Sequence, residues 1–147
     1  MDAYKHVLFA TDLSDESRRL AGRARDLATR YSAKLSLIHV VEYSPLLEYG
    51  DGQIFPTGLE LEEKLAEQAS HKLKQWGREL DVRDEDQRVE IGATKTEILR
   101  VAKECGVDLI VVGSHGRHGL GLLLGSTANA VLHGAPCDVL ALRVHPS

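Results

Sequence analysis

The chain has 147 residues, 43% hydrophobic and 27% charged, and its 18 Lys and Arg against 22 Asp and Glu give a formal charge of −4. This length and composition predict a single ordinary domain over residues 1–147 and exclude a disordered chain. Interspersed charges and few aromatic residues exclude a nucleic-acid surface. No run approaches the ~20 apolar residues that a membrane helix needs, and the N-terminus does not have the pattern of a signal peptide.

The first predicted elements are a strand and a helix joined by a tight turn. HVLFAT, at His6 to Thr11, is a short run rich in β-forming residues, as expected of a strand covered on both faces. Asp12 ends it. Ser14 then begins the helix SDESRRLAGRARDLATRY, with Asp15 and Glu16 in the first turn, where the helix dipole favours negative charge.

The middle of the chain predicts a second strand, a long loop, a helix and a third strand. KLSLIHVV at Lys34 to Val41 is the second strand, and the loop from Glu42 to Gly58 contains prolines and glycines that prevent regular structure. A helix of about five turns is marked by apolar residues at helical spacing: Leu61, Leu65, Ala69, Leu73, Trp76 and Leu80. RVEIG, at 88–92, is a short third strand.

The last third of the chain predicts two more strands and two more helices. Thr94 and Glu97 form a capping box that opens a helix, and Gly106 can terminate it. DLIVVG is the fourth strand, and STANAVLHGA is a helix with Ser126 as its N-cap. DVLALRV, beginning at Asp138, is the fifth strand.

Alternating strands and helices predict an open, Rossmann-like α/β fold, in which a five-stranded parallel sheet carries helices on both faces. In such sheets ligands bind outside the carboxyl ends of the strands, where the strand order reverses. The loops at 11–14, 41–58 and 113–126 lie at that edge and are therefore the candidate functional segments.

The glycine-rich segment GSHGRHGLGLLLGS, directly after the fourth strand, has the features of a phosphate cradle. Gly113 and Gly116 can adopt positive φ and let a ligand approach the backbone. Gly125 and Ser126 stand where the last helix begins, so free N–H groups, the helix dipole and the hydroxyls of Ser126 and Thr127 favour an anion. The alternative is that the glycines serve turn geometry only. The segment matches neither a P-loop nor a dinucleotide fingerprint.

Other polar residues in these loops allow several roles. The Asp12 carboxylate either accepts a hydrogen bond from a ribose hydroxyl or adenine amine, helps to hold Mg²⁺, or caps the first helix beside Ser14. His115 and His118 have HxxH spacing without an evident third ligand, so no metal site is expected there. His115 lies beside the phosphates or lines the loop, and Arg117 is a cation at its edge. Because catalytic signatures are absent, we expect a binding protein rather than an enzyme.

Taken together, these residues resemble the universal stress protein family, the UspA-type α/β domain. The resemblance covers essentially the whole chain and rests on YKHVLFATDLSDES, AKLSLIHVVE, GATKTEILRVAKECGVDLIVVGSHGRHGL and LGSTANAVLHGAPCDVLALR. It implies the strand order 3-2-1-4-5 in a cytoplasmic protein induced under stress. The presence of only two cysteines also favours a reducing cytoplasm.

One branch of this family binds ATP or AMP through the pattern GxxG, nine residues, then G[ST]. In this chain eight residues, not nine, separate Gly116 from Gly125, but all the glycines are kept, and we favour nucleotide binding. The resemblance implies that adenine lies near Asp12 and contacts the backbone of Val40 and Val41. The complete predicted set is Ala10, Thr11, Asp12, Val40, Val41, Gly113, His115, Gly116, Arg117, Gly125, Ser126 and Thr127.

The fifth strand would lie at the sheet edge, where unpaired backbone groups invite another strand. In related dimers this strand pairs with its twin, which predicts a homodimer through Val139 to Val144. The alternative is an edge guarded by Arg143 and Pro146. The predicted function is a dimeric stress-response module that binds ATP or AMP. The alternatives are a nucleotide-free interaction protein and a slow ATPase, in which Asp12 holds Mg²⁺ and His115 lies near the transferred phosphate.

Overall fold

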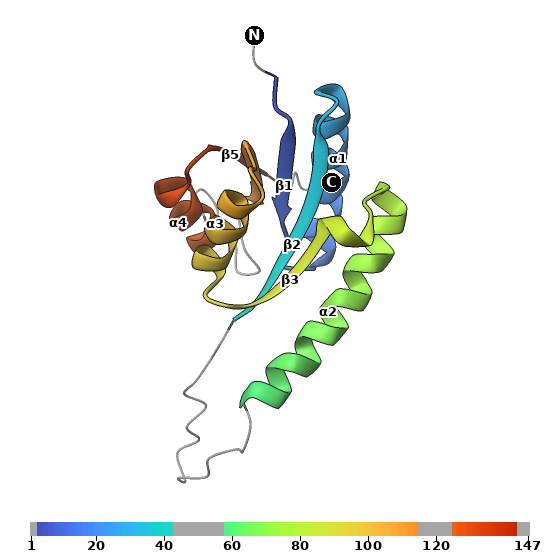
Figure 1. The fold of residues 1–147 in the computed structure, drawn as a ribbon, viewed down its shortest axis with the longest axis vertical. Coiled ribbons are helices and arrows are strands. Elements are labelled where there is room, and N and C mark those ends of the chain that lie inside the picture. The colour runs from blue at the N-terminus through green and yellow to red at the C-terminus, as the bar shows by residue number, and fades with distance from the viewer. Residues whose placement is uncertain (1–2, 43–57, 115–124, 144–147) are drawn as a thin grey trace.

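The computed structural model describes residues 3–42, 58–114 and 125–143, with side chains from residue 61 onward in the second range. Within these residues strands and helices alternate in the predicted order (Figure 1). The elements are β1 His6–Ala10, α1 Asp15–Arg30, β2 Lys34–Glu42, α2 Gly58–Leu80, the 3-10 helix η1 Asp84–Asp86, β3 Gln87–Gly92, α3 Thr94–Glu104, β4 Leu109–Gly113, α4 Ser126–Gly134 and β5 Asp138–Leu142. Most of the predicted loop after the second strand, 43–57, lies outside the described residues.

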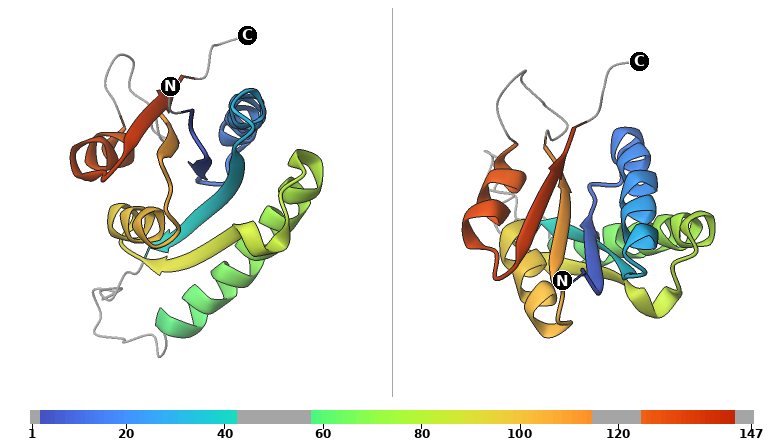
Figure 2. Two further views of the ribbon diagram at one scale, coloured as in Figure 1. Left: turned by 45° about the horizontal axis from the view of Figure 1, so that its top comes forward. Right: turned by 90° about the horizontal axis from the view of Figure 1, so that it is seen from above.

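The described strands form a parallel sheet in the order β3-β2-β1-β4-β5, which confirms the predicted architecture (Figure 2). β1 lies at the centre and pairs with β2 on one side and β4 on the other. The chain therefore builds outward from β1 in one direction and then in the other. Because all strands are parallel, the loops after β1 and β4 leave from the same edge of the sheet at this reversal.

Helices cover both faces of the sheet, and β1 contributes to both hydrophobic cores. Val7 and Phe9 pack with residues of α1 and α2, whereas Leu8 packs with residues of α3 and α4. All three side chains are fully buried. Burying a side chain of this size stabilises the fold by about 1.5–3 kcal/mol. Because successive side chains of β1 point to opposite faces of the sheet, this one central strand packs against both helical layers.

α1 begins where the sequence predicts. Ser14 is the N-cap, and its Oγ accepts a hydrogen bond from the Ser17 backbone N–H at 3.1 Å. Asp15 and Glu16 lie in the first turn, where they complement the helix dipole. A cap of this kind stabilises a helix by about 1 kcal/mol. It also fixes the direction in which the chain leaves β1.

The predicted capping box at the start of α3 is wrong. Ala93 is the N-cap, and no side chain caps the helix. The Thr94 hydroxyl instead donates to Glu42 Oε1 at 2.8 Å, and the Glu97 carboxylate pairs with Arg100 at 2.8 Å. Both side chains thus have partners other than the backbone N–H groups that a capping box would satisfy.

The end of α3 agrees with the sequence. Gly106 follows the C-cap with φ 67, the left-handed conformation that glycine adopts at little cost. The backbone N–H of Val107 donates to the Ala102 carbonyl at 2.9 Å, and that of Gly106 donates to Lys103 at 3.4 Å. This pair of hydrogen bonds is a Schellman motif, which turns the chain into β4.

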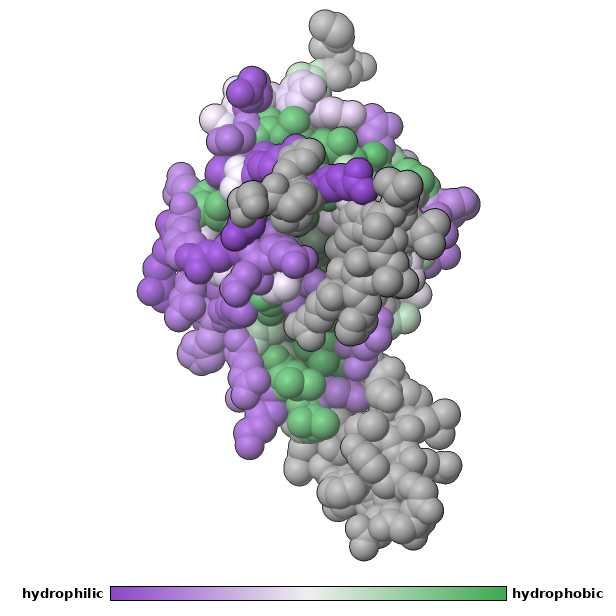
Figure 3. All heavy atoms as spheres, turned by 180° about the vertical axis from the view of Figure 1, so that it is seen from behind, coloured by the Kyte–Doolittle hydropathy of each residue, from purple (hydrophilic) through white to green (hydrophobic). Residues whose placement is uncertain are grey.

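α2 is present, but it buries only part of its predicted apolar pattern. Leu73 and Trp76 lie in the core, whereas Leu61 and Leu65 are 49% and 43% exposed. Figure 3 shows apolar surface near the start of this helix, in the lower part of the coloured surface. Although α2 spans 23 residues, no described helix combines the length and the apolar character of a membrane-crossing segment.

Candidate functional site

The candidate site lies at the carboxyl edge of the sheet, where β1, β2 and β4 end. Ala10, the last residue of β1, pairs with Ile38, and the next N–H, from Thr11, donates to the Ile38 carbonyl at 2.9 Å. β2 continues beyond this pair and there pairs with β3. On their β1 side, Val40 and Val41 therefore have no described strand beside them, while their side chains are buried. As far as the described residues show, their backbone rather than their side chains is the part that a ligand could contact.

Thr11 shapes the turn that follows β1. Its buried hydroxyl lies 2.6 Å from the Ser17 hydroxyl and accepts from the Leu13 backbone N–H at 2.9 Å. Its carbonyl accepts a hydrogen bond from His39 Nδ1 at 2.8 Å. The first two contacts use the Thr11 hydroxyl inside the protein, and the third uses its backbone carbonyl. Thr11 thus supports the candidate site by holding the turn in shape.

Asp12 combines a structural contact with an available oxygen. Its Oδ1 accepts from the Ser14 backbone N–H at 2.9 Å, and among the described residues its second oxygen has no hydrogen-bond partner. The following residue, Leu13, takes φ 64, and its carbonyl accepts from Lys72 Nζ of α2 at 2.8 Å. This turn therefore presents one carboxylate oxygen of the half-buried residue Asp12 at the edge of the sheet.

Two backbone hydrogen bonds bring the start of α4 against the end of β4. The Ser114 N–H donates to the Leu142 carbonyl of β5 at 2.7 Å. The Ser114 carbonyl accepts from the Gly125 N–H at 2.6 Å. Residues 113–114 and 125–126 are thereby neighbours in space, as the phosphate-cradle hypothesis requires.

One predicted detail of this segment is wrong, and one possibility is not used. Gly113, which can adopt a positive φ, does not do so here, because it pairs with Leu142 in the ladder between β4 and β5 and is extended. Ser126 is not the N-cap. Gly125 takes that position with φ −61 and ψ 155, and its carbonyl accepts from the Asn129 N–H at 3.0 Å, the first hydrogen bond of the helix.

The start of α4 suits an anion better than the starts of α1 and α3. Those two helices carry acidic residues in their first turns, whereas α4 carries none. Ser126 and Thr127 are exposed and occupy the first helical positions, where backbone N–H groups have no acceptor within the helix. Together with the positive end of the helix dipole, these groups can donate to phosphate oxygens.

The rest of the predicted set stays a prediction. His115, Gly116 and Arg117 lie outside the described residues, as do His118 and the residues that set the spacing between Gly116 and Gly125. In the described part of the chain, no three His, Cys, Asp or Glu side chains are grouped as metal ligands would be. The described candidate site is therefore made of backbone, hydroxyls and one carboxylate.

Three residues that support the site were not predicted: Ser17, His39 and Lys72. Each forms a hydrogen bond with the turn after β1. His39 and Lys72 donate to backbone carbonyls of this turn, and the Ser17 hydroxyl bonds to the Thr11 hydroxyl. Their sequence patterns are those of an ordinary helix residue, strand residue and surface lysine. No motif marks them, because their partners lie on other elements.

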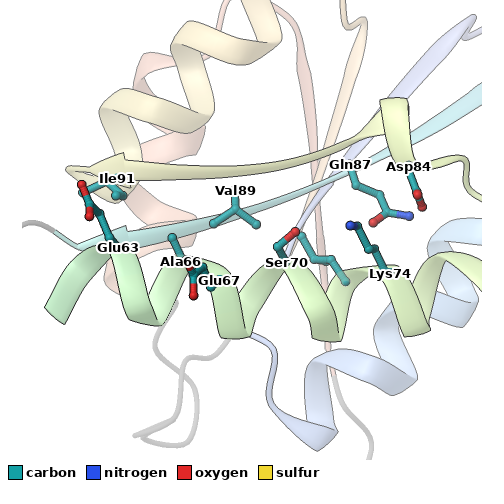
Figure 4. Close-up of a pocket in the computed structure, with 10 residues that line it drawn as sticks. Glu63, Ala66, Glu67, Ser70, Lys74, Asp84, Gln87, Val89 and Ile91 are labelled. Atoms are coloured by element: carbon teal, nitrogen blue, oxygen red, sulfur yellow. The ribbon is translucent and has the colours of Figure 1, made fainter. Parts of the chain in front are cut away.

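A separate groove lies between α2 and the edge strand β3 (Figure 4). It has a volume of about 460 Å³, and its lining includes apolar Ala66, Val89 and Ile91 beside acidic Glu63 and Glu67. None of the predicted site residues lines it. The groove is therefore distinct from the site at the carboxyl edge.

Comparisons with known proteins agree with this architecture. The model of the Universal stress protein family matches residues 3–143. Universal stress protein A homolog 2 of Coxiella burnetii is 47% identical over 148 residues, which cover 100% of both chains. The structure of UspA from Lactobacillus plantarum is 27% identical, with a TM-score of 0.75 over 97% of this chain and 100% of that one. A universal stress protein in complex with cAMP is 26% identical, with a TM-score of 0.62 over 98% and 100%.

Proposed function

Because the chain belongs to the universal stress protein family, we propose that it is a cytoplasmic stress-response protein that binds ATP or AMP at the carboxyl edge of its sheet. The observation that carries the proposal is the hydrogen bond between the Ser114 carbonyl and the Gly125 N–H. It places a helix start without acidic residues at the end of β4. A relative of the same fold binds cAMP, which shares adenine, ribose and phosphate with these nucleotides.

Each part of the nucleotide has a suitable group at this edge. The phosphates would lie at the start of α4, with Ser126 and Thr127 as donors. Adenine would contact the backbone of Val40 and Val41 beyond the end of β1. The second oxygen of Asp12 would accept from ribose or from the adenine amine, or would bind Mg²⁺ carried by ATP. These are binding contacts, and we propose binding without turnover.

Asp12→Ala is expected to weaken ATP and AMP binding roughly 10- to 100-fold, because a hydrogen bond to a charged group contributes about 1.5–3 kcal/mol. Isothermal titration calorimetry measures this change. Asp84→Ala is the matched control, since Asp84 is an exposed aspartate in η1, directly before β3 begins. The Asp84→Ala variant should bind ATP and AMP with the affinity of the wild type.

Three results would argue against this assignment. A wild-type protein that shows no thermal shift at millimolar nucleotide does not bind it, which favours a nucleotide-free interaction protein. An equal loss of affinity in both variants would mean that the Asp12 carboxylate makes no specific contact with the nucleotide. Phosphate release by the wild type that disappears in Asp12→Ala would favour the slow ATPase instead.

We also propose that β5 forms the interface of a homodimer. It is the last strand of the sheet, and Leu140 is 36% exposed on it beside exposed Ala141. Leu132 on the preceding helix is 50% exposed. An apolar strand at the edge of a sheet favours pairing with a second copy of itself. The predicted interface continues to Val144, which lies outside the described residues.

Leu140→Lys is expected to convert the dimer into a monomer, because a charge on an edge strand opposes pairing with an identical strand. Size-exclusion chromatography with light scattering measures the mass. Leu61→Lys is the control, since Leu61 is even more exposed but lies on α2. A monomeric wild type, or a Leu140→Lys variant that stays dimeric, would contradict the interface.

A further inference from the structure

A second cavity lies at the opposite edge of the sheet, where β1, β2 and β3 begin. Its volume is about 510 Å³, within the range of small-molecule sites. His6 of β1 and Ser36 of β2 line it, and each keeps a small exposed fraction, 9% and 7%. The imidazole of His6 and the hydroxyl of Ser36 are thus nearly buried and still line a cavity that a ligand can enter.

The hydrogen bonds of His6 fix its protonation pattern. Nδ1 lies 3.2 Å from the Cys105 carbonyl, which can only accept, so Nδ1 carries the proton of the neutral ring. Nε2 is then an acceptor, and the Ser36 hydroxyl 2.7 Å away must donate to it. Burial lowers the pKa of His6, which keeps the ring neutral at neutral pH, although the hydrogen bond to Cys105 opposes this shift.

The backbone of His6 is also held in place. The Asp108 carboxylate accepts from the backbone N–H of His6 at 3.0 Å and from that of Lys5 at 2.9 Å. The ring is therefore fixed both by its own hydrogen bond to Cys105 and by the anchored strand that carries it. A serine bonded to a histidine that a third group orients is the arrangement of an activated nucleophile.

We propose that Ser36 is a nucleophile activated by His6, and that the cavity at the amino edge of the sheet accepts small activated esters. Ser36 Oγ forms a bond to the carbonyl carbon while its proton moves to His6 Nε2. The bond between that carbon and the alcohol oxygen then breaks, and the alcohol leaves with the proton from Nε2. A water oxygen then forms a bond to the acyl carbon while one water proton moves to His6 Nε2. The bond between that carbon and Ser36 Oγ breaks, Oγ takes the proton back from Nε2, and the carboxylic acid leaves.

The cavity lining indicates which esters fit. Leu8 and Val101 supply an apolar wall for a short acyl group. Lys34 and Arg88 line the same cavity together with the carboxylates Glu85 and Asp86. The two cations supply positive charge for the oxygen that becomes negative during attack. Both are partly exposed ion-pair residues, since Lys34 pairs with Asp86 at 2.9 Å and Arg88 with Glu90 at 3.4 Å. Esters of short acyl groups with a good leaving alcohol are therefore the expected substrates.

A fluorophosphonate probe and p-nitrophenyl acetate test the proposal on the intact chain. The probe is expected to add one phosphonyl group to the peptide that contains Ser36, with loss of fluoride, as measured by mass spectrometry. Ser36→Ala should lose this label, and Ser36→Cys should regain acylation by the ester. His6→Gln should slow labelling roughly 100-fold, since general-base assistance contributes at least that factor.

Ser70→Ala is the matched control, because Ser70 lines the groove beside α2 rather than this cavity. It should label like the wild type. Circular dichroism of each variant shows whether it is folded. If the His6→Gln variant does not fold, the acylation of the Ser36→Cys variant still decides the question. Absence of label on Ser36 at saturating probe would overturn the proposal. So would an unchanged labelling rate in folded His6→Gln, which would make the pair purely structural.

Discussion

Gly77→Ala is expected to lower the free energy of unfolding by about 2–3 kcal/mol, as overpacking of a filled site does. Gly77 lies within α2, where the new Cβ would overlap the Gln87 side-chain amide and stand 2.7 Å from the Val82 carbonyl oxygen. The Gln87 side chain can move, but the Val82 oxygen belongs to the backbone. That carbonyl also accepts from Gln87 Nε2 at 3.1 Å, so the turn from α2 toward β3 must shift.

Gly22→Ala is the matched control for this change. Gly22 lies within α1, where a new Cβ would have no atom within 4 Å. Alanine in an open helical position is more favourable than glycine by about 0.5–1 kcal/mol, so this variant should be slightly more stable than the wild type. Urea unfolding measures both variants. A Gly77→Ala protein as stable as Gly22→Ala would show that the packing around Gly77 is looser than described.

Asp108→Ala is expected to cost about 2–3 kcal/mol at neutral pH, because it leaves the N–H groups of Lys5 and His6 without their charged acceptor. Burial alone would raise the pKa of Asp108, but these hydrogen bonds outweigh it and hold the pKa below its usual value. The stabilisation is therefore present above the unfolded pKa of about 3.9 and is lost as the pH falls through the folded pKa.

The acid branch of the stability curve separates this effect from a general loss of packing. Urea unfolding between neutral and acid pH should show a weaker dependence on pH in Asp108→Ala than in the wild type. Asp138→Ala is the control, since Asp138 is exposed and accepts a hydrogen bond only from the exposed Tyr4 hydroxyl among the described residues. Asp138→Ala should lower the free energy of unfolding by less than about 1 kcal/mol. Equal costs for the two variants would contradict a special role for Asp108.

The order and type of the elements could be predicted because they depend on local patterns. HVLFAT and DLIVVG are apolar runs of strand length, and Ser14 caps α1 through Ser17, only three residues away. The capping box at Thr94 failed because that hydroxyl binds Glu42, 52 positions away in the sequence. For Ser14 and Thr94, the local rule thus succeeds where no distant side chain competes for the capping hydroxyl and fails where one does.

The candidate site could be predicted only where its residues belong to a motif. Asp12 and the pair Gly125 and Ser126 stand at strand and helix ends that the pattern reveals, and the structure brings those ends to one edge. His39 and Lys72 carry no such mark, because their partners in the turn after β1 are backbone carbonyls of another element. For the same reason no motif search finds Ser36 and His6, which are 30 positions apart on adjacent strands.

The central position of β1 also has a consequence for folding kinetics. β1, β2 and β3 follow one another and can pair early, but the seam between β1 and β4 joins residues 102 positions apart. Closing so long a loop costs entropy before the new contacts compensate, so we expect this seam to form late and to limit the folding rate. Asp12 belongs to the early half of the sheet and α4 to the late half. A nucleotide bound across them would hold the seam closed and slow unfolding.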